Sequence, residues 1–284
     1  MKLILTSIVF SFLLFSFSSS AQYDDQRVVS SYYEFEEGST EYLYGDNVVF
    51  RANPSSSAKA IDTLSIGSEI EIVRKTEEKT SFNGLDWNWY KVKVGRKTGY
   101  ILAGLIALDR VRYDDVVYLV TVAGVKKSTE DWEYIDYKVR ARVILPTGDF
   151  YGHETNLNTN SFYIDAFGSR GLNGVDNMLR INLFAEACGV DGGEVYIFNN
   201  GSRLFKALSL SSIGDGGVFW FSETVIFPED EGGWNEVVRY EREHGVAMDE
   251  DGNWTRAIIN TLNLKFENDQ FSPNIEEFEF GEDD

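Results

Sequence analysis

The sequence GDNVVFRANP, residues 45–54, opens the stretch that decides the fold of the first part of the chain. The apolar run VVFRA ends at Pro54, which cannot donate a hydrogen bond to a sheet and favours a strand end. In SIGSEIEIV, residues 65–73, apolar and charged residues alternate with the period of two of a half-buried strand. WYKVKV, residues 89–94, and TGYILA, residues 98–103, are two further predicted strands joined by a hairpin. Five short strands with tight turns within about 65 residues are typical of a small β-barrel.

This region resembles a bacterial SH3-like (SH3b) domain. The matching residues are NVVFRANPS at 47–55, TLSIG at 63–67 and WYKVKV at 89–94, followed by GRKTGYI with Arg96 as an insertion. The resemblance covers less than a quarter of the chain and implies a barrel over residues 45–108. It also implies a binding module of cell-envelope proteins, whose ligand is a peptidoglycan stem or bridge peptide held in a groove between surface loops. The matching loops here are residues 53–58 and 76–87.

Single residues of the barrel also have physical interpretations. Gly67 and Gly99 are expected to adopt backbone conformations that other residues resist. Trp89, Tyr100 and Ile101 are candidate core positions.

The ends of the chain predict export. Residues 1–21 contain one basic residue, Lys2, then an apolar run and small residues, which is the pattern of a secretory signal peptide. The apolar run is short for a transmembrane helix, so no integral membrane segment is expected after cleavage. Residues 22–44 are interpreted as an acidic linker or an edge strand, and residues 281–284 as an acidic tail. The predicted location is extracytoplasmic, either periplasmic or secreted.

The composition excludes several kinds of partner. The formal net charge is −20, and it becomes −21 without Lys2. Such a charge repels nucleic acid and anionic lipid surfaces, so neither is an expected partner. Cys188 is the only cysteine, so no internal disulfide can form and the fold must be held by its core.

Residues 110–280 predict a second, larger antiparallel β domain that we assign to no family. Its apolar segments are strand-like, and the Asn200-Gly201 and Asp251-Gly252 pairs predict hairpin turns. Residues 175–180 are the one candidate for a helical turn. The succession of hairpins indicates a sandwich or meander, and the absence of a fixed repeat disfavours a propeller. The predicted fold class is therefore all-β, with a small SH3-like barrel followed by this domain.

An enzyme is the less favoured interpretation. A peptidoglycan-processing cysteine peptidase could use Cys188 as nucleophile and His244 as base, which occur in a permitted order. However, Cys188 precedes a predicted strand rather than a helix whose N-terminal amides would lower its pKa, and His244 lies in a charged stretch interpreted as a turn. With only two histidines and no zinc motif, no metal or other cofactor is expected. Carboxylate pairs for glycan cleavage are too numerous among 46 acidic residues to choose one.

Aromatic side chains are the candidate ligand-binding groups. Neighbouring residues on a strand point to opposite faces, so we expect one of each pair to be exposed. The candidates are Trp87, Trp89, Tyr90 and Trp220. A weaker calcium hypothesis rests on the alternating oxygen ligands Asp249, Asp251 and Asn253, although Asp and Gly also occur in such turns for backbone reasons.

Together these patterns predict an exported, non-catalytic binding or scaffolding protein of the cell envelope. Its barrel would dock on a peptidoglycan stem peptide or on an envelope protein. The alternatives are the cysteine peptidase and a spacer or subunit of an envelope complex.

Overall fold

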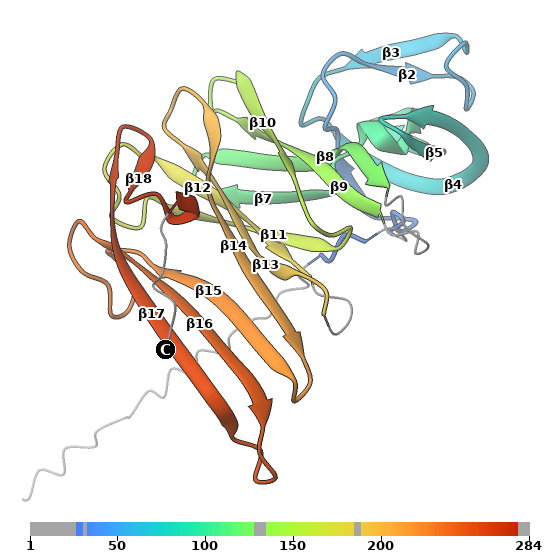
Figure 1. Cartoon of the computed structure of the whole chain (residues 1–284). Helices are drawn as coiled ribbons and strands as arrows, with labels where there is room; N and C mark the ends of the chain where they lie inside the picture. Colours follow the sequence, from blue (N-terminus) through green and yellow to red (C-terminus); the bar gives the residue numbers. More distant parts are fainter. Residues whose placement is uncertain (1–26, 31–32, 128–134, 185–188, 278–284) are drawn as a thin grey trace, which may run out of the picture.

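A computed structural model describes residues 27–30, 33–127, 135–184 and 189–277 of the chain. The predicted signal peptide, the acidic tail and Cys188 lie outside these residues. The described residues contain no α-helix, only strands and two short 3-10 turns (Figure 1). The all-β prediction is therefore confirmed.

The strands form three antiparallel sheets. The first has the order β1-β4-β5-β6-β2-β3, the second β10-β9-β8-β7, and the third runs in chain order from β11 to β18. The elements are β1 Thr40–Tyr42, β2 Val48–Arg51, β3 Ala60–Leu64, β4 Glu69–Phe82, β5 Leu85–Val94, β6 Lys97–Leu102, η1 Ala103–Leu105, β7 Asp109–Tyr113, β8 Val116–Lys127, β9 Ile135–Ile144, β10 Phe150–Asn156, β11 Phe162–Gly168, β12 Asn177–Leu183, β13 Gly192–Asn199, β14 Leu204–Asp215, β15 Phe219–Ile226, β16 Val238–Met248, β17 Trp254–Glu267, β18 Gln270–Ser272 and η2 Ile275–Glu277.

The first sheet is the predicted barrel. Its five strands β2 to β6 curve strongly, and the long β4 and β5 wrap around one side (Figure 1). β4 is longer than the SEIEIV pattern indicated because the hairpin turn lies at Asn83-Gly84, where both residues have positive φ. An Asn-Gly pair is the usual signal for such a turn. β1, from the segment interpreted as a linker or edge strand, pairs with Glu69, Ile70 and Glu71 at the start of β4.

The two glycines of the barrel have different roles. Gly67 has φ +74°, a conformation that disfavours any side chain, as expected. Gly99 has no positive φ, so the expectation for it was wrong. A Cβ at Gly99 would instead lie 2.6 Å from the Arg51 carbonyl oxygen and 2.6 Å from Phe50, so close packing excludes a side chain there.

The second sheet packs face to face with β11, β12 and β13 of the third sheet, which gives a sandwich. Its core contains Tyr118, Val139 and Val143 on one side and Phe162 and Ile181 on the other, all essentially inaccessible to solvent. Residues 175–180 do not form a helical turn, because β12 begins at Asn177. Both faces of β12 are buried, so its first residues, 177–180, lack the alternation that would have marked the start of the strand.

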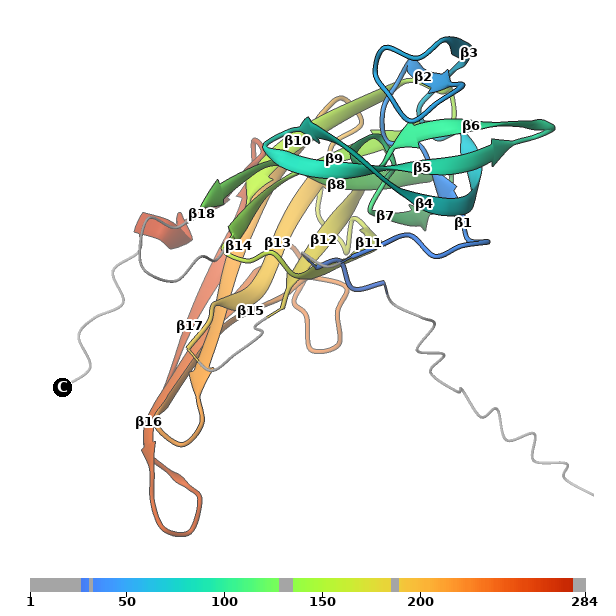
Figure 2. The same cartoon turned by 90° about the vertical axis from the view of Figure 1, so that its right-hand side faces the viewer.

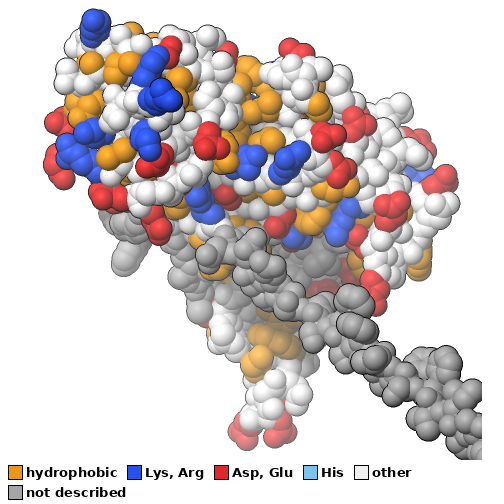
Figure 3. All heavy atoms as spheres, turned by 180° about the vertical axis from the view of Figure 1, so that it is seen from behind, with side chains coloured by type: hydrophobic (Ala, Val, Ile, Leu, Met, Phe, Trp, Pro, Cys, Tyr) orange, Lys and Arg blue, Asp and Glu red, His pale blue; other side chains and the backbone are white. Residues whose placement is uncertain are grey.

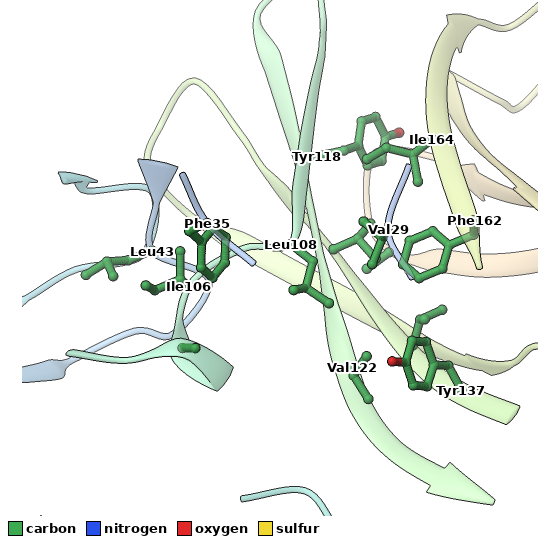
Figure 4. Packing of buried hydrophobic residues seen from close by; sticks show 14 of the residues in the cluster. Val29, Phe35, Leu43, Ile106, Leu108, Tyr118, Val122, Tyr137, Phe162 and Ile164 are labelled. Atoms are coloured by element: carbon green, nitrogen blue, oxygen red, sulfur yellow. The ribbon is translucent and has the colours of Figure 1, made fainter. Parts of the chain in front are cut away.

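One hydrophobic core joins the barrel to the sandwich. Leu108, 3% exposed, packs in the same cluster as Phe35 from the N-terminal segment and Tyr137 from β9 (Figure 4). The N-terminal segment is fixed in this junction, since the backbone of Val29 exchanges hydrogen bonds of 2.8 and 2.9 Å with Phe162. The barrel and the sandwich therefore share buried surface rather than being joined by a free linker.

The later strands of the third sheet leave the sandwich as a protrusion. We use this name for residues 212–226 and 238–264, which extend away from the rest of the molecule in both ribbon views (Figures 1 and 2). A second core lies where the protrusion begins, around Phe198, Phe227 and Tyr240. The predicted Asn200-Gly201 and Asp251-Gly252 turns join β13 to β14 and β16 to β17.

Candidate functional site

A groove of about 350 Å³ lies between the barrel and the N-terminal segment. The β4–β5 hairpin forms one wall, residues 33–35 form the other, and Tyr137 of β9 also lines the groove. The groove therefore exists only because three separate parts of the chain meet at the junction described above.

The two walls meet in a floor of aromatic rings, with Tyr33 and Phe35 from one wall and Tyr90 from the other. Phe35 makes edge-to-face contacts with Tyr33 and with Tyr90, each with ring centroids 5.4 Å apart. Burial raises the pKa of Tyr90 to about 12, against a hydrogen bond with the Phe35 backbone that lowers it. The Tyr90 hydroxyl is thus neutral near pH 7, and the floor presents apolar rings with polar edges.

The rim of the groove carries charges of both signs. Lys75 of β4 forms an ion pair with Glu34, which links the two walls. Lys79 and Asp86 also line the groove, and both belong to the hairpin. Such a rim can bind carboxylates and amines of one ligand at separate points.

Hydrogen bonds hold the hairpin wall in place. The Trp87 indole donates to the Phe82 carbonyl oxygen at 3.0 Å, and the Asn88 amide donates to the Thr76 carbonyl oxygen at 2.8 Å. The buried Thr76 hydroxyl donates to the Trp89 carbonyl oxygen at 2.9 Å. Trp87 also packs against Gly104, where a Cβ would lie 2.9 Å from the indole. These contacts fix the rings before a ligand arrives.

Of the four aromatic residues proposed from the sequence, Trp87 and Tyr90 line the groove. Trp89 does not line the groove; its side chain is buried, and its indole donates to the Thr80 hydroxyl at 2.9 Å. Trp220 lies in another sheet, on β15, where its half-buried indole covers Gly245. Trp89 and Tyr90 are neighbours and both are buried, because both faces of β5 are covered there.

The wall formed by Tyr33, Glu34 and Phe35, and the contribution of Tyr137, were not predicted from the sequence. The first three lie in a segment interpreted as a linker or edge strand, and Tyr137 lies about 100 residues further along the chain. The cluster of aromatics in YYEFEE, residues 32–37, was the available signal, since a solvated linker has no need of rings.

The comparison with family models matches residues 46–107 to the bacterial SH3 domain. These residues form a bacterial SH3 domain. The match agrees with the resemblance seen in the sequence, and domains of this kind are binding modules. The searches of curated proteins and of solved structures gave no match.

The loops expected to form the ligand groove of the SH3 domain are not arranged as predicted. Residues 53–58 form a loop, closed by a hydrogen bond of 2.7 Å from Arg51 to the Ala58 carbonyl oxygen, but they contribute nothing to the groove. Residues 76–82 belong to strand β4 rather than to a loop. The groove of this SH3 domain therefore lies along a hairpin and not between two loops.

The structure also places His244 of the alternative peptidase hypothesis. His244 lies within strand β16, opposite Phe221 and Ile258, so its assignment to a charged turn was wrong. The apolar neighbours on adjacent strands were not recognisable from the local sequence RYEREHG. Cys188 lies outside the described residues.

The three calcium candidates lie in the turn between β16 and β17. The Asp249 carboxylate accepts hydrogen bonds from the backbone N–H groups of Asp251 and Asn253 at 3.0 and 2.8 Å. These bonds lower the pKa of Asp249. Over the part of the chain that the structure describes, no group of three or more His, Cys, Asp or Glu could hold a metal ion. In the same residues, no helix has the length and apolar composition needed to cross a membrane.

Proposed function

We propose that the chain is an exported, non-catalytic binding protein of the cell envelope, and that its groove holds a peptidoglycan stem peptide. The observation that carries this proposal is the groove itself, in which an aromatic floor of Tyr33, Phe35 and Tyr90 is combined with a rim of both charges. A short peptide with free carboxylates and an amine has matching chemistry. The bacterial SH3 family of residues 46–107 supports the same class of ligand.

Each part of the groove has a role in this proposal. Lys79 of the hairpin binds a carboxylate of the peptide, and Asp86 on the same hairpin binds its amine. The rings of the floor and Trp87 pack against the aliphatic parts. The ion pair between Lys75 and Glu34 keeps the walls at a fixed separation, so that little ordering is required on binding.

The test is retention of the mature protein on purified peptidoglycan, together with a titration of its tryptophan fluorescence by soluble muropeptides. Lys79→Glu reverses one exposed charge on the rim, and we expect about a tenfold loss of affinity. Lys59→Glu is the matched control, because Lys59 is exposed on the same domain and does not line the groove. Its affinity should be that of the unsubstituted protein.

Three results would contradict the proposal: no retention of the unsubstituted protein, equal affinity for the two variants, or turnover of the muropeptides. Turnover that is lost in Cys188→Ala would instead favour the peptidase. Retention on an envelope protein but not on peptidoglycan would favour the scaffolding alternative.

A further inference from the structure

The outer edge of the protrusion is formed by strand β17, which among the described residues is paired on one side only over most of its length. β17 pairs with β16 from Trp254 to Leu264, in the register Met248↔Trp254 to Val238↔Leu264. On the other side of β17, strand β18 pairs only with Lys265, Phe266 and Glu267. Among the described residues, the outer edge of residues 254–264 therefore has no partner strand, and β17 lies at the margin of the protrusion (Figures 1 and 2). Such an edge offers a row of backbone donors and acceptors to another strand.

This edge lacks the features that usually prevent pairing. Residues 254–264, WTRAIINTLNL, contain no proline and one charged residue, Arg256. Ile259 is 65% exposed. The protrusion also carries the exposed apolar side chains Val218, Val246 and Met248, and Figure 3 shows hydrophobic side chains above the acidic tip. Edge strands that remain single are normally protected by lysines, proline or bulges.

The sequence of the edge is complementary to itself. In an antiparallel pair centred on Ile258, Arg256 would lie opposite Asn260 and Thr255 opposite Thr261. Trp254 would lie opposite Leu262, and Ala257 opposite Ile259. No like charges meet, and apolar residues face apolar residues, which is the pattern that stabilises cross-strand pairs.

We propose that β17 pairs antiparallel with β17 of a second copy of this chain, around a two-fold axis at Ile258. The same surface then serves both copies, as in most homodimers. The two third sheets become one continuous sheet, and the two SH3 domains lie at opposite ends of the dimer. A single strand pair is a small interface, so the dimer is weak and depends on concentration.

Charge provides an independent feature of this dimer. The full sequence has a net charge of −20, or −21 without Lys2 of the predicted signal peptide, and Glu241 and Glu243 lie on β16 next to the edge. The two copies therefore repel one another at long range. Residues 254–264 contain no Asp or Glu, so their pairing brings no carboxylates together. Added salt screens the repulsion, so the dimer should become more stable as salt increases.

The first experiment is sedimentation velocity of the full mature chain from about 5 to about 500 µM, a range that covers weak dimers. We expect the dimer fraction to rise with concentration and with salt. Ile259→Lys places a charge on the edge and should weaken association about tenfold or more. Val218→Lys is the matched control, because Val218 is 57% exposed on the same protrusion but lies off the edge. Circular dichroism checks that both variants fold.

The second experiment tests the register. In a Cys188→Ser background, Ile258→Cys should form a disulfide-linked dimer in a glutathione redox buffer, since the two sulfurs meet at the two-fold axis. Thr224→Cys, which is exposed on β15 away from the edge, should stay reduced in the same buffer. A protein that stays monomeric over the whole concentration range overturns the proposal, as does a dimer that persists equally in Ile259→Lys. Equal cross-linking of the two cysteine variants overturns the pairing of β17 with itself.

Discussion

Asp109 shows how burial at the junction controls the charge of a single residue. Asp109 is 8% exposed at the start of β7, and its carboxylate accepts a hydrogen bond of 2.7 Å from the Arg110 backbone N–H. Burial raises its pKa to about 7, while Arg27 lowers it and Glu41 and Asp165 raise it further. Glu41 is itself buried but is paired with Arg27 at 2.8 Å. The junction of barrel, sandwich and N-terminal segment thus contains two buried carboxyl groups. Glu41 is ion-paired with Arg27, whereas burial favours the neutral form of Asp109.

The raised pKa of Asp109 predicts a pH-dependent stability. Between about pH 4 and pH 7 the folded protein keeps a proton on Asp109 that the unfolded chain has released. The stabilisation that the neutral carboxyl gives the folded protein is therefore present at low pH and is lost as the pH rises towards about 7. We expect Asp109→Asn to be more stable than the unsubstituted protein at pH 8, by on the order of 2 kcal/mol, and to differ less at pH 5. Denaturant unfolding at the two pH values measures this.

The exposed Asp62 provides the control for this prediction. Its pKa is lowered by Lys97 and by the Thr63 backbone, which is the opposite direction, so Asp62→Asn should not become more stable at pH 8. A stability difference between Asp109→Asn and the unsubstituted protein that stays constant with pH would contradict our account of Asp109.

At the scale of elements, the β4–β5 hairpin determines the site. The alternation in SEIEIV predicted the beginning of β4, but its continuation to Phe82 depended on the turn at Asn83-Gly84. β4 carries bulges between Ile72 and Arg74 and between Lys75 and Lys79. The bulges obscure the period of two there, so the local sequence contained no sign against the loop at residues 76–87 that the family resemblance implied.

The close approach of β6 to its neighbour β2 at Gly99 supplies a prediction for the SH3 domain. Gly99→Ala places a Cβ 2.6 Å from the Arg51 carbonyl oxygen, a backbone atom that cannot move without shifting β2. We expect a loss of about 1–3 kcal/mol in the free energy of unfolding. Gly95→Ala is the comparison, because φ at Gly95 is +56° and no atom lies within 4 Å of the added Cβ. Its loss of stability therefore measures backbone strain without crowding. If Gly99→Ala unfolded at the same denaturant concentration as the unsubstituted protein, the packing of β6 against β2 would not exclude a side chain at position 99.

At the scale of the whole molecule, the shared core makes the barrel and the sandwich dependent on each other. Leu108 lies in the cluster that includes Phe35, Val122 and Tyr137 (Figure 4). The protrusion, by contrast, has few buried side chains beyond Tyr240 and Leu264. We therefore expect two levels of stability within one chain, with the protrusion opening more easily than the junction.

Leu108→Ala tests this coupling. Truncation of a buried leucine costs about 2–5 kcal/mol, and we expect that loss to lower the protection of amides in β5 and in β8 together. Hydrogen exchange measured by mass spectrometry reports the two strands separately. Ile61→Ala is the control, since Ile61 is 37% exposed on β3 and should change neither strand appreciably. Loss of protection in β5 alone would show that the barrel unfolds independently of the sandwich.

The sequence by itself determined the all-β class, the bacterial SH3 domain and most of the hairpins. These depend on local patterns: alternation of apolar residues, turn pairs such as Asn200-Gly201, and the motif of residues 46–107. The groove was decided by the tertiary structure, because Phe35, Tyr90 and Tyr137 meet only when the N-terminal segment is fixed between barrel and sandwich. The start of β12 at Asn177, the burial of both Trp89 and Tyr90 in β5 and the position of His244 within a strand were also beyond local patterns. Burial on both faces removes the alternation in β12 and β5, and the apolar neighbours of His244 lie on adjacent strands.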